Sequence, residues 1–137
     1  MAGISRTKAA LRISGDDLDP DEVSKLLGAV PTDSARKGET RQLPSGRSTL
    51  ARTGSWNLKA QDCSPGDLGA QIKSTFSMLT DDLDVWKGIS NRYKCDLFCG
   101  LFMNEMNEGV SLNPDVLAIL GDRGVVLALD IYHPTAD

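Results

Sequence analysis

The stretch TKAALRISGDDLDPDEVSKLLG, residues 7–28, decides the fold class. Its first part alternates apolar and polar residues, a pattern typical of a half-buried strand. The apolar side chains that share one side are Ala9, Leu11 and Ile13. A helix follows, because Asp19 can cap free backbone N–H groups and Pro20 suits the first helical position. Gly28 ends this helix, so the stretch predicts a chain that mixes strands and helices.

Apolar periodicity predicts the remaining elements. Strands are predicted over 53–60, 95–103 and 125–132, and residues 104–109 look like a hairpin turn that leads into a short strand ending at Leu112. Helices are predicted over 68–79 and 83–93, and a third begins at Asn113 and is closed by Gly121 and Gly124. We therefore expect an α+β fold, with a mainly antiparallel sheet of about five strands and helices packed on one face.

A short sequence repeat, which we call the internal echo, leaves the topology open. LDPD at 18–21 and LNPD at 112–115 each follow a predicted strand and open a helix of about two turns, ending at Gly28 and Gly121. One explanation is a duplicated β-α-β unit, which would give ferredoxin-like halves. The other is convergence on a favourable capping sequence.

Composition predicts one domain over residues 1–137, with residues 134–137 as a flexible tail. No stretch approaches the roughly 20 apolar residues that a membrane span needs, and the first residues do not resemble a signal peptide. The three cysteines are an odd number, and Cys95 and Cys99 are too far apart along one strand to form a disulfide. Reduced thiols and a cytoplasmic location are the expectation.

Several kinds of site are disfavoured. There is one histidine, His133, and no C-x-x-C pair, so we expect no metal site and no histidine-based triad. No phosphate-binding glycine motif occurs, and no cofactor is expected. The acidic turn, which comprises Asp16, Asp17, Asp19, Asp21 and Glu22, lacks the glycine and the final glutamate of a calcium loop, and it is interpreted as helix capping. We expect no catalytic residue.

The strongest charge feature is the basic segment, residues 32–52, which has no periodicity and is predicted to be a long irregular loop. Within it, residues 36–52 carry net charge +4 on a chain of net charge −4, so the other residues sum to −8. Its cations are Arg36, Lys37, Arg41, Arg47 and Arg52. They could bind an anion or an acidic protein surface, or they could pair with the chain's own acidic turn. Nucleic acid is disfavoured by the sequence pI of about 4.9 and by the lack of an aromatic residue in this segment.

Trp56 and Asp130, which lie outside the basic segment, are added to this candidate binding surface. Trp56 could stack on a ligand, although a core position is the more common one for tryptophan. Gly54 could permit a bulge or the close approach of another group. Asp130 shares a strand face with Tyr132 and could hold the basic segment through an arginine.

Several motifs in order resemble those of an uncharacterised, largely bacterial family, domain of unknown function 4279. They are LRISG at 11–15, LDPDEV at 18–23, LLG at 26–28, PT at 31–32, RKGE at 36–39, RTGSW at 52–56 and LDIY at 129–132. The resemblance spans nearly the whole chain. It implies a compact domain in which the basic segment and the Gly54–Trp56 segment belong to one pattern, and it carries over no catalytic residue.

Three functions remain open. The leading hypothesis is a non-catalytic, immunity-like or accessory protein that binds an acidic protein surface. The second is a regulatory domain that binds a small anion or nucleotide. The third is an enzyme that uses Asp16, Asp17 or Asp130 together with an arginine, which requires these carboxylates to share a pocket.

Overall fold

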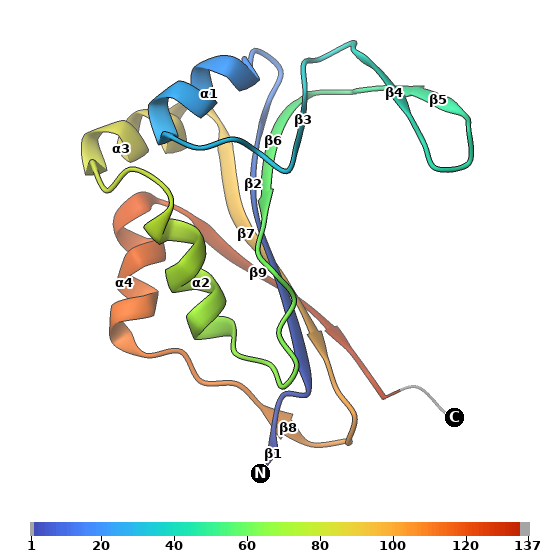
Figure 1. Cartoon of the computed structure of the whole chain (residues 1–137). Coiled ribbons are helices and arrows are strands. Elements are labelled where there is room, and N and C mark those ends of the chain that lie inside the picture. The colour runs from blue at the N-terminus through green and yellow to red at the C-terminus, as the bar shows by residue number, and fades with distance from the viewer. Residues whose placement is uncertain (1, 135–137) are drawn as a thin grey trace.

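A five-stranded sheet forms the centre of the molecule (Figure 1). The computed structural model describes residues 2–134. The strand order is β3 (Asp33–Ala35), β6 (Gly54–Lys59), β2 (Arg6–Gly15), β7 (Lys94–Phe102) and β9 (Val126–Tyr132). Neighbouring strands are antiparallel, except that β7 and β9 are parallel. The predicted α+β class and mainly antiparallel sheet are therefore confirmed.

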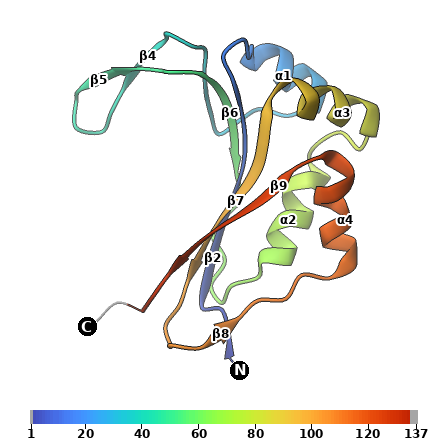
Figure 2. The same ribbon diagram turned by 180° about the vertical axis from the view of Figure 1, so that it is seen from behind.

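Four helices cover one face of this sheet, as predicted (Figures 1 and 2). They are α1 (Pro20–Leu27), α2 (Leu68–Ser77), α3 (Leu83–Arg92) and α4 (Pro114–Arg123). The cap predicted for α1 is confirmed, because the Asp19 side chain accepts a hydrogen bond from the backbone N–H of Asp21 and Gly28 adopts a φ of 74°. The largest buried side chains between helices and sheet include Trp56, Trp86 and Leu97. None of the described helices is long and apolar enough to cross a membrane.

Of the two glycines predicted to close α4, Gly124 is confirmed and Gly121 is wrong. The helix passes through Gly121 and ends at Gly124, whose φ is 69°. A glycine inside a helix costs only about 1 kcal/mol relative to alanine. Burial of Val116 and Leu120 against the core outweighs this cost and keeps the last turn helical.

The hairpin predicted after β7 is also wrong. The short strand β8 (Glu108–Gly109) pairs in parallel with β1 (Ala2–Gly3) in a separate two-stranded sheet. Glu108 organises this region, because its carboxylate accepts hydrogen bonds from Ser5 and from the backbone N–H of Asn104. The contact with Ser5 and the pairing of β8 with β1 join residues about a hundred positions apart, which periodicity along the chain does not reveal.

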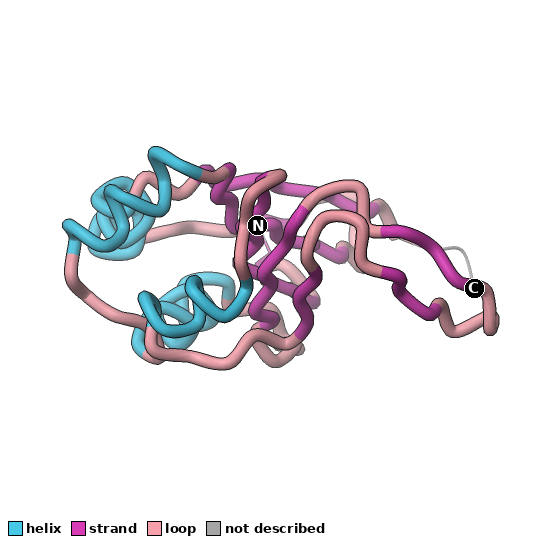
Figure 3. Tube along the Cα trace, turned by 90° about the horizontal axis from the view of Figure 1, so that it is seen from above, coloured by secondary structure: helices cyan, strands magenta, loops and turns pink. Residues whose placement is uncertain are grey.

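The basic segment is not irregular throughout. Its first part forms β3, which pairs with β6. Strands β4 (Thr40–Gln42) and β5 (Ser48–Leu50) form a hairpin, which we call the β4–β5 arm. The arm projects from the sheet on the side away from the helices (Figures 1 and 3). Its side chains are largely exposed, so the apolar alternation that predicts a strand is absent from its sequence.

The two units of the internal echo do not occupy equivalent places in the sheet. Along the chain, α1 lies between β2 and β3, which both pair with β6 and are therefore parallel to each other. Helices α2 and α3 lie between β6 and β7, which both pair with β2 and are also parallel to each other. The order β3-β6-β2-β7 therefore consists of two interleaved β-α-β units, the ferredoxin-like arrangement that the sequence left open, and α4 with β9 extends it beyond β7. Most of the predicted tail, residues 135–137, lies outside the described residues.

Candidate functional site

The sheet face opposite the helices is the candidate site, and we call it the open face. Side chains alternate between the two faces of a strand, so Leu11 and Leu97 point to the helices while Arg12 and Asp96 point away. The open face carries five cations, Arg6, Lys8, Arg12, Lys59 and Lys94. These outnumber the three acids of the same face, Asp33, Asp96 and Asp130, although the whole chain has net charge −4. The open face is therefore a positive region on an acidic protein.

Aromatic rings lie among these cations. The Arg12 guanidinium is 4.3 Å from the ring centre of Phe98, and the Arg6 guanidinium is 4.0 Å from that of Phe102. The rings of Phe102 and Tyr132 stack, with centres 4.6 Å apart and planes 4° apart. Arginine over an aromatic ring gains a favourable interaction with the ring's quadrupole and loses conformational freedom. Arg6 and Arg12 are thus held in place before any partner arrives.

Arg12 is also tied to Asp96. Its Nε and one terminal nitrogen donate to the two carboxylate oxygens of Asp96 at 2.8 and 2.7 Å. Asp96 is buried, and the paired geometry compensates its charge. The hydrogen bond to Asp96 raises the pKa of Arg12. Arg12 is consequently a structural cation, whereas Lys59 and Lys94 form no ion pair with any acid in the described part of the chain.

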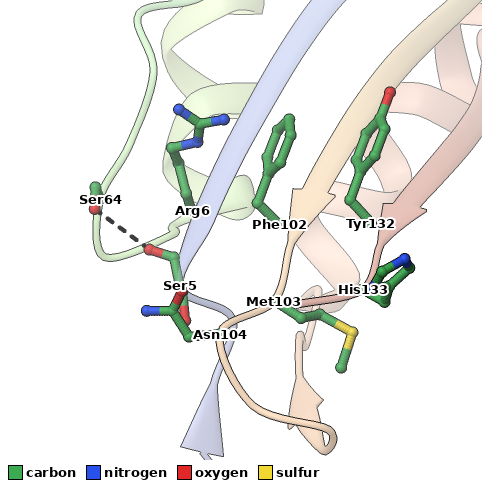
Figure 4. Close-up of a pocket in the computed structure, with 8 residues that line it drawn as sticks. All are labelled: Ser5, Arg6, Ser64, Phe102, Met103, Asn104, Tyr132 and His133. Carbon is green, nitrogen blue, oxygen red and sulfur yellow. Dashed lines mark hydrogen bonds between the residues drawn. The ribbon is translucent and has the colours of Figure 1, made fainter. Parts of the chain in front are cut away.

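A hollow of about 540 Å³ lies at one end of the open face (Figure 4). Arg6, Phe102 and Tyr132 stand side by side at its wall. The Tyr132 hydroxyl donates to Asp130, and this hydrogen bond raises the pKa of Tyr132. Two smaller hollows of about 300 Å³ each continue along the open face, one beside Arg12 and Lys94 and one beside Lys59. The open face is therefore hollowed at several points along its length.

The base of the basic segment folds onto the acidic turn. The Arg36 guanidinium lies 2.8 Å from a carboxylate oxygen of Asp19 and 3.0 Å from one of Asp21. Lys37 lies 3.3 Å from Asp16. Hydrogen bonds from Thr53 and Lys37 lower the pKa of Asp16. These two cations are thus occupied within the protein.

The other cations of the basic segment lie further from the acidic turn. Arg41 is 3.4 Å from Asp33 at the start of the β4–β5 arm. Arg47 and Arg52 are exposed, and within residues 2–134 they form no ion pair. The basic segment therefore turns inward at its base and outward along the arm.

The structure does not place Trp56 on the surface beside the basic segment. Trp56 is fully buried between the sheet and the helices, and its Nε1 donates to the Ser24 hydroxyl at 2.9 Å. Asp130 lies on the open face, but on β9 at the far edge of the sheet from β3, so the structure does not bring it to the basic segment, and its carboxylate accepts a hydrogen bond from Tyr132. The predicted contact between Asp130 and an arginine of the basic segment is therefore wrong.

A family model for domain of unknown function DUF4279 matches residues 5–134. The chain belongs to the DUF4279 family. The match includes all five strands of the sheet, the four helices and the β4–β5 arm. No curated protein and no solved structure matches the chain. The function of this DUF4279 chain must therefore be argued from the open face and the arm.

The carboxylates considered for catalysis do not form one site. Lys8 of β2 and Asp130 of β9 lie in the same row across the sheet, since both register with Gly100. Asp16 lies further along the direction of β2, at a distance of about 26 Å for a strand rise of about 3.3 Å per residue. Asp16 and Asp130 are therefore too far apart to act on one substrate. In the part of the chain that the structure describes, no three His, Cys, Asp or Glu side chains are placed to hold a metal ion.

The cysteines allow a direct prediction about reactivity. Burial raises the pKa of Cys95 to about 11 and that of Cys99 to about 12, whereas Cys63 is only half-buried. The thiolate is the reactive form, so at pH 8 a thiol reagent such as Ellman's should label Cys63 alone in the folded protein and all three thiols in denaturant. In the unfolded chain the pKa of these thiols is 9.0. Their contribution to the free energy of unfolding should therefore be complete below pH 9 and should be lost as the pH rises toward 12. Labelling of Cys95 or Cys99 in the native state at pH 8 would contradict the buried placement.

Inspection of the sequence did not single out the open face. The signal was present in β2, where Arg6, Lys8 and Arg12 occupy the polar positions of the apolar alternation. Those positions look like ordinary solvent-exposed residues until β6, β7 and β9 are placed beside them. Phe98 and Phe102 gave no separate signal, because each belongs to a strand with many other apolar residues, and Tyr132 was noted only as sharing a strand face with Asp130.

Proposed function

We propose that this DUF4279 chain is a non-catalytic binding domain that engages an acidic surface of a protein partner, as an accessory or immunity-like protein would. The observation that carries the proposal is the open face, which presents five cations and is not covered by any helix of the described chain (Figure 3). Charge complementarity with an acidic surface would speed association and select against basic partners. The aromatic rings beneath Arg6 and Arg12 supply rigid contact area.

The β4–β5 arm supports the same proposal. It projects on the side of the open face, so one partner can contact both (Figures 1 and 3). A two-stranded hairpin has little stability of its own in water. The arm exposes Leu43 and Leu50 and carries Arg47, and Arg52 follows its second strand. An acidic partner with apolar residues at its contact surface would cover exposed groups of both kinds.

The proposal places this binding in a bacterial cytoplasm. Three free cysteines, two of them buried, are compatible with a reducing compartment.

A second candidate function is the binding of a small anion, and the hollow beside Arg6 favours it. The two candidates differ in which residues of the open face a probe should contact.

The test uses a defined acidic probe and charge reversal. A synthetic peptide rich in Asp, Glu and Leu is titrated into the ¹⁵N-labelled protein, and shifted amides are mapped. We expect shifts in β2, β6, β7 and the arm, and an affinity that falls with added salt. The double variant Lys59→Glu, Lys94→Glu should weaken binding by about tenfold, which corresponds to about 1.4 kcal/mol.

The matched control is Lys25→Glu, Lys87→Glu, which changes the net charge equally on exposed helix positions. It should leave the affinity nearly unchanged. Equal weakening by both double variants would mean that only net charge matters and would refute a specific surface. Shifts caused by pyrophosphate and confined to the hollow around Arg6, without any peptide binding, would replace this proposal with the small-anion function.

Partner identification completes the test. A photo-crosslinking residue at position 59 on the open face is compared with one at position 87 on α3. The proposal requires a protein that cross-links from position 59 alone, and whose purified form binds the wild-type chain more tightly than the Lys94→Glu variant.

A further inference from the structure

The outer edge of β9 is a second exposed surface of a different kind. β9 ends the strand order of the sheet, so along the described chain no strand pairs with its outer side. Its sequence VLALDIY contains one charge, and four of its apolar or aromatic side chains are exposed by 44–61%. They are Val126, Leu129, Ile131 and Tyr132. The opposite edge, β3, has only three residues, and short edge strands are a common protection against pairing. β9 lacks that protection.

The hydrogen-bonding direction of β9 follows from one contact. The backbone N–H of Met103 donates to the carbonyl of Tyr132 at 3.1 Å, so the backbone polar groups of Tyr132 face β7. Both polar groups of one strand residue point to the same side, and the side alternates along the strand. The N–H and C=O groups of Leu127, Leu129 and Ile131 therefore face outward.

We propose that β9 pairs in antiparallel fashion with β9 of a second copy of this chain, about a two-fold axis at Leu129. The two Leu129 residues would then exchange hydrogen bonds with each other, and Leu127 of each copy would do so with Ile131 of the other. This arrangement makes about six new backbone hydrogen bonds. It also pairs the whole of β9, residues 126–132. Any other register would pair only part of this strand.

The side chains complement one another in this register. On the helix side of the sheet, Leu129 meets Leu129, and Leu127 meets Ile131, so apolar residues lie opposite apolar residues. On the open face, Val126 of one copy lies opposite Tyr132 of the other. One side of the Tyr132 ring is already stacked on Phe102, and Val126 of the second copy would cover the other side. Aromatic and β-branched residues form favourable cross-strand pairs.

Charge supports the same register. Asp130 lies opposite Ala128, so no like charges face each other. Moving the axis by one residue, to Asp130, would place the two carboxylates directly opposite each other, which destabilises a strand pair. The axis at Leu129 joins two five-stranded sheets into one and turns both open faces to the same side. This inference does not depend on the proposed function, because it concerns the edge of the sheet and not its charged face.

The test is the oligomeric state measured by sedimentation equilibrium over a range of protein concentrations. The wild-type chain is expected to be a dimer that dissociates on dilution. Leu129→Lys should give a monomer, because the two-fold axis would place the two introduced lysine side chains beside each other in the interface. Leu117→Lys, on α4 and at similar exposure, is the matched control and should remain a dimer. A wild-type monomer at all concentrations, or equal dissociation by both variants, overturns the proposal.

A second measurement covers the case in which Leu129→Lys fails to fold. In a Cys63→Ser background, Leu129→Cys should be joined into a covalent dimer by a short bismaleimide, because the two-fold axis brings the two thiols together. Leu117→Cys in the same background should not. Cross-linking from position 117 but not from position 129 would show a different interface and would also overturn the proposal.

Discussion

Replacing Trp56 with alanine is expected to lower the free energy of unfolding by about 3–5 kcal/mol, the usual range for removal of a large aromatic side chain from a core. Trp56 is fully buried, and its ring fills the space between β6 and α1. The change also leaves the Ser24 hydroxyl without its donor. Small domains have a total stability of about 5–15 kcal/mol, so this variant should unfold at much lower denaturant concentration. Urea unfolding followed by circular dichroism measures the effect.

Two further variants separate packing from binding at this position. Trp56→Phe keeps most of the apolar volume and should cost less than Trp56→Ala. Ser24→Ala removes only the hydrogen-bond acceptor and should cost about 1 kcal/mol. If Trp56→Ala abolished binding of the acidic probe without changing stability, Trp56 would be a surface residue and its placement in the core would be wrong.

Replacing Gly54 with alanine is expected to lower stability by about 1–3 kcal/mol, the range for overpacking in a core. A Cβ atom at Gly54 would lie 2.7 Å from the carbonyl oxygen of Gly15 and 2.9 Å from atoms of Leu18. Two of the three nearest atoms belong to the backbone, so the clash cannot be relieved by a side-chain rotation. The sequence-based expectation that Gly54 allows the close approach of another group is therefore confirmed.

Gly88→Ala is the matched control, because it makes the same chemical change in the opposite setting. Gly88 lies within α3, and a Cβ there meets nothing within 4 Å. Alanine is favoured over glycine inside a helix by about 1 kcal/mol, so this variant should raise the melting temperature while Gly54→Ala lowers it. Equal melting temperatures for the two variants would contradict the packing described around Gly54.

Those parts of the fold that depend on neighbours along the chain could be predicted from the sequence. The alternation in β2, the cap at Asp19 and the break between α2 and α3 all act over a few residues, and each is confirmed. Trp56 occupies the core position that is the more common one for tryptophan, and not the ligand-stacking position that was the alternative. Local reasoning failed at Gly121, where tertiary burial of Leu120 outweighs a local preference.

The candidate site was harder to predict. The charge asymmetry of the basic segment was visible, but the segment divides into a base held by the acidic turn and an arm that projects. Which cations remain available depends on where the acids lie in space. Asp19 and Asp21 reach Arg36 across about fifteen residues of chain, a distance over which sequence spacing carries no geometric information.

The sequence by itself determined the fold class, the ends of most helices and the inner face of β2, because capping and periodicity are local properties of the backbone. Only the tertiary structure decided the order of the strands, the parallel pairing of β7 with β9 and the hairpin of the arm, because these depend on contacts between distant residues. It also decided the functional surface. The cations of β2, β6 and β7 are far apart along the chain, and they form one open face because strands pair side by side and alternate their side chains.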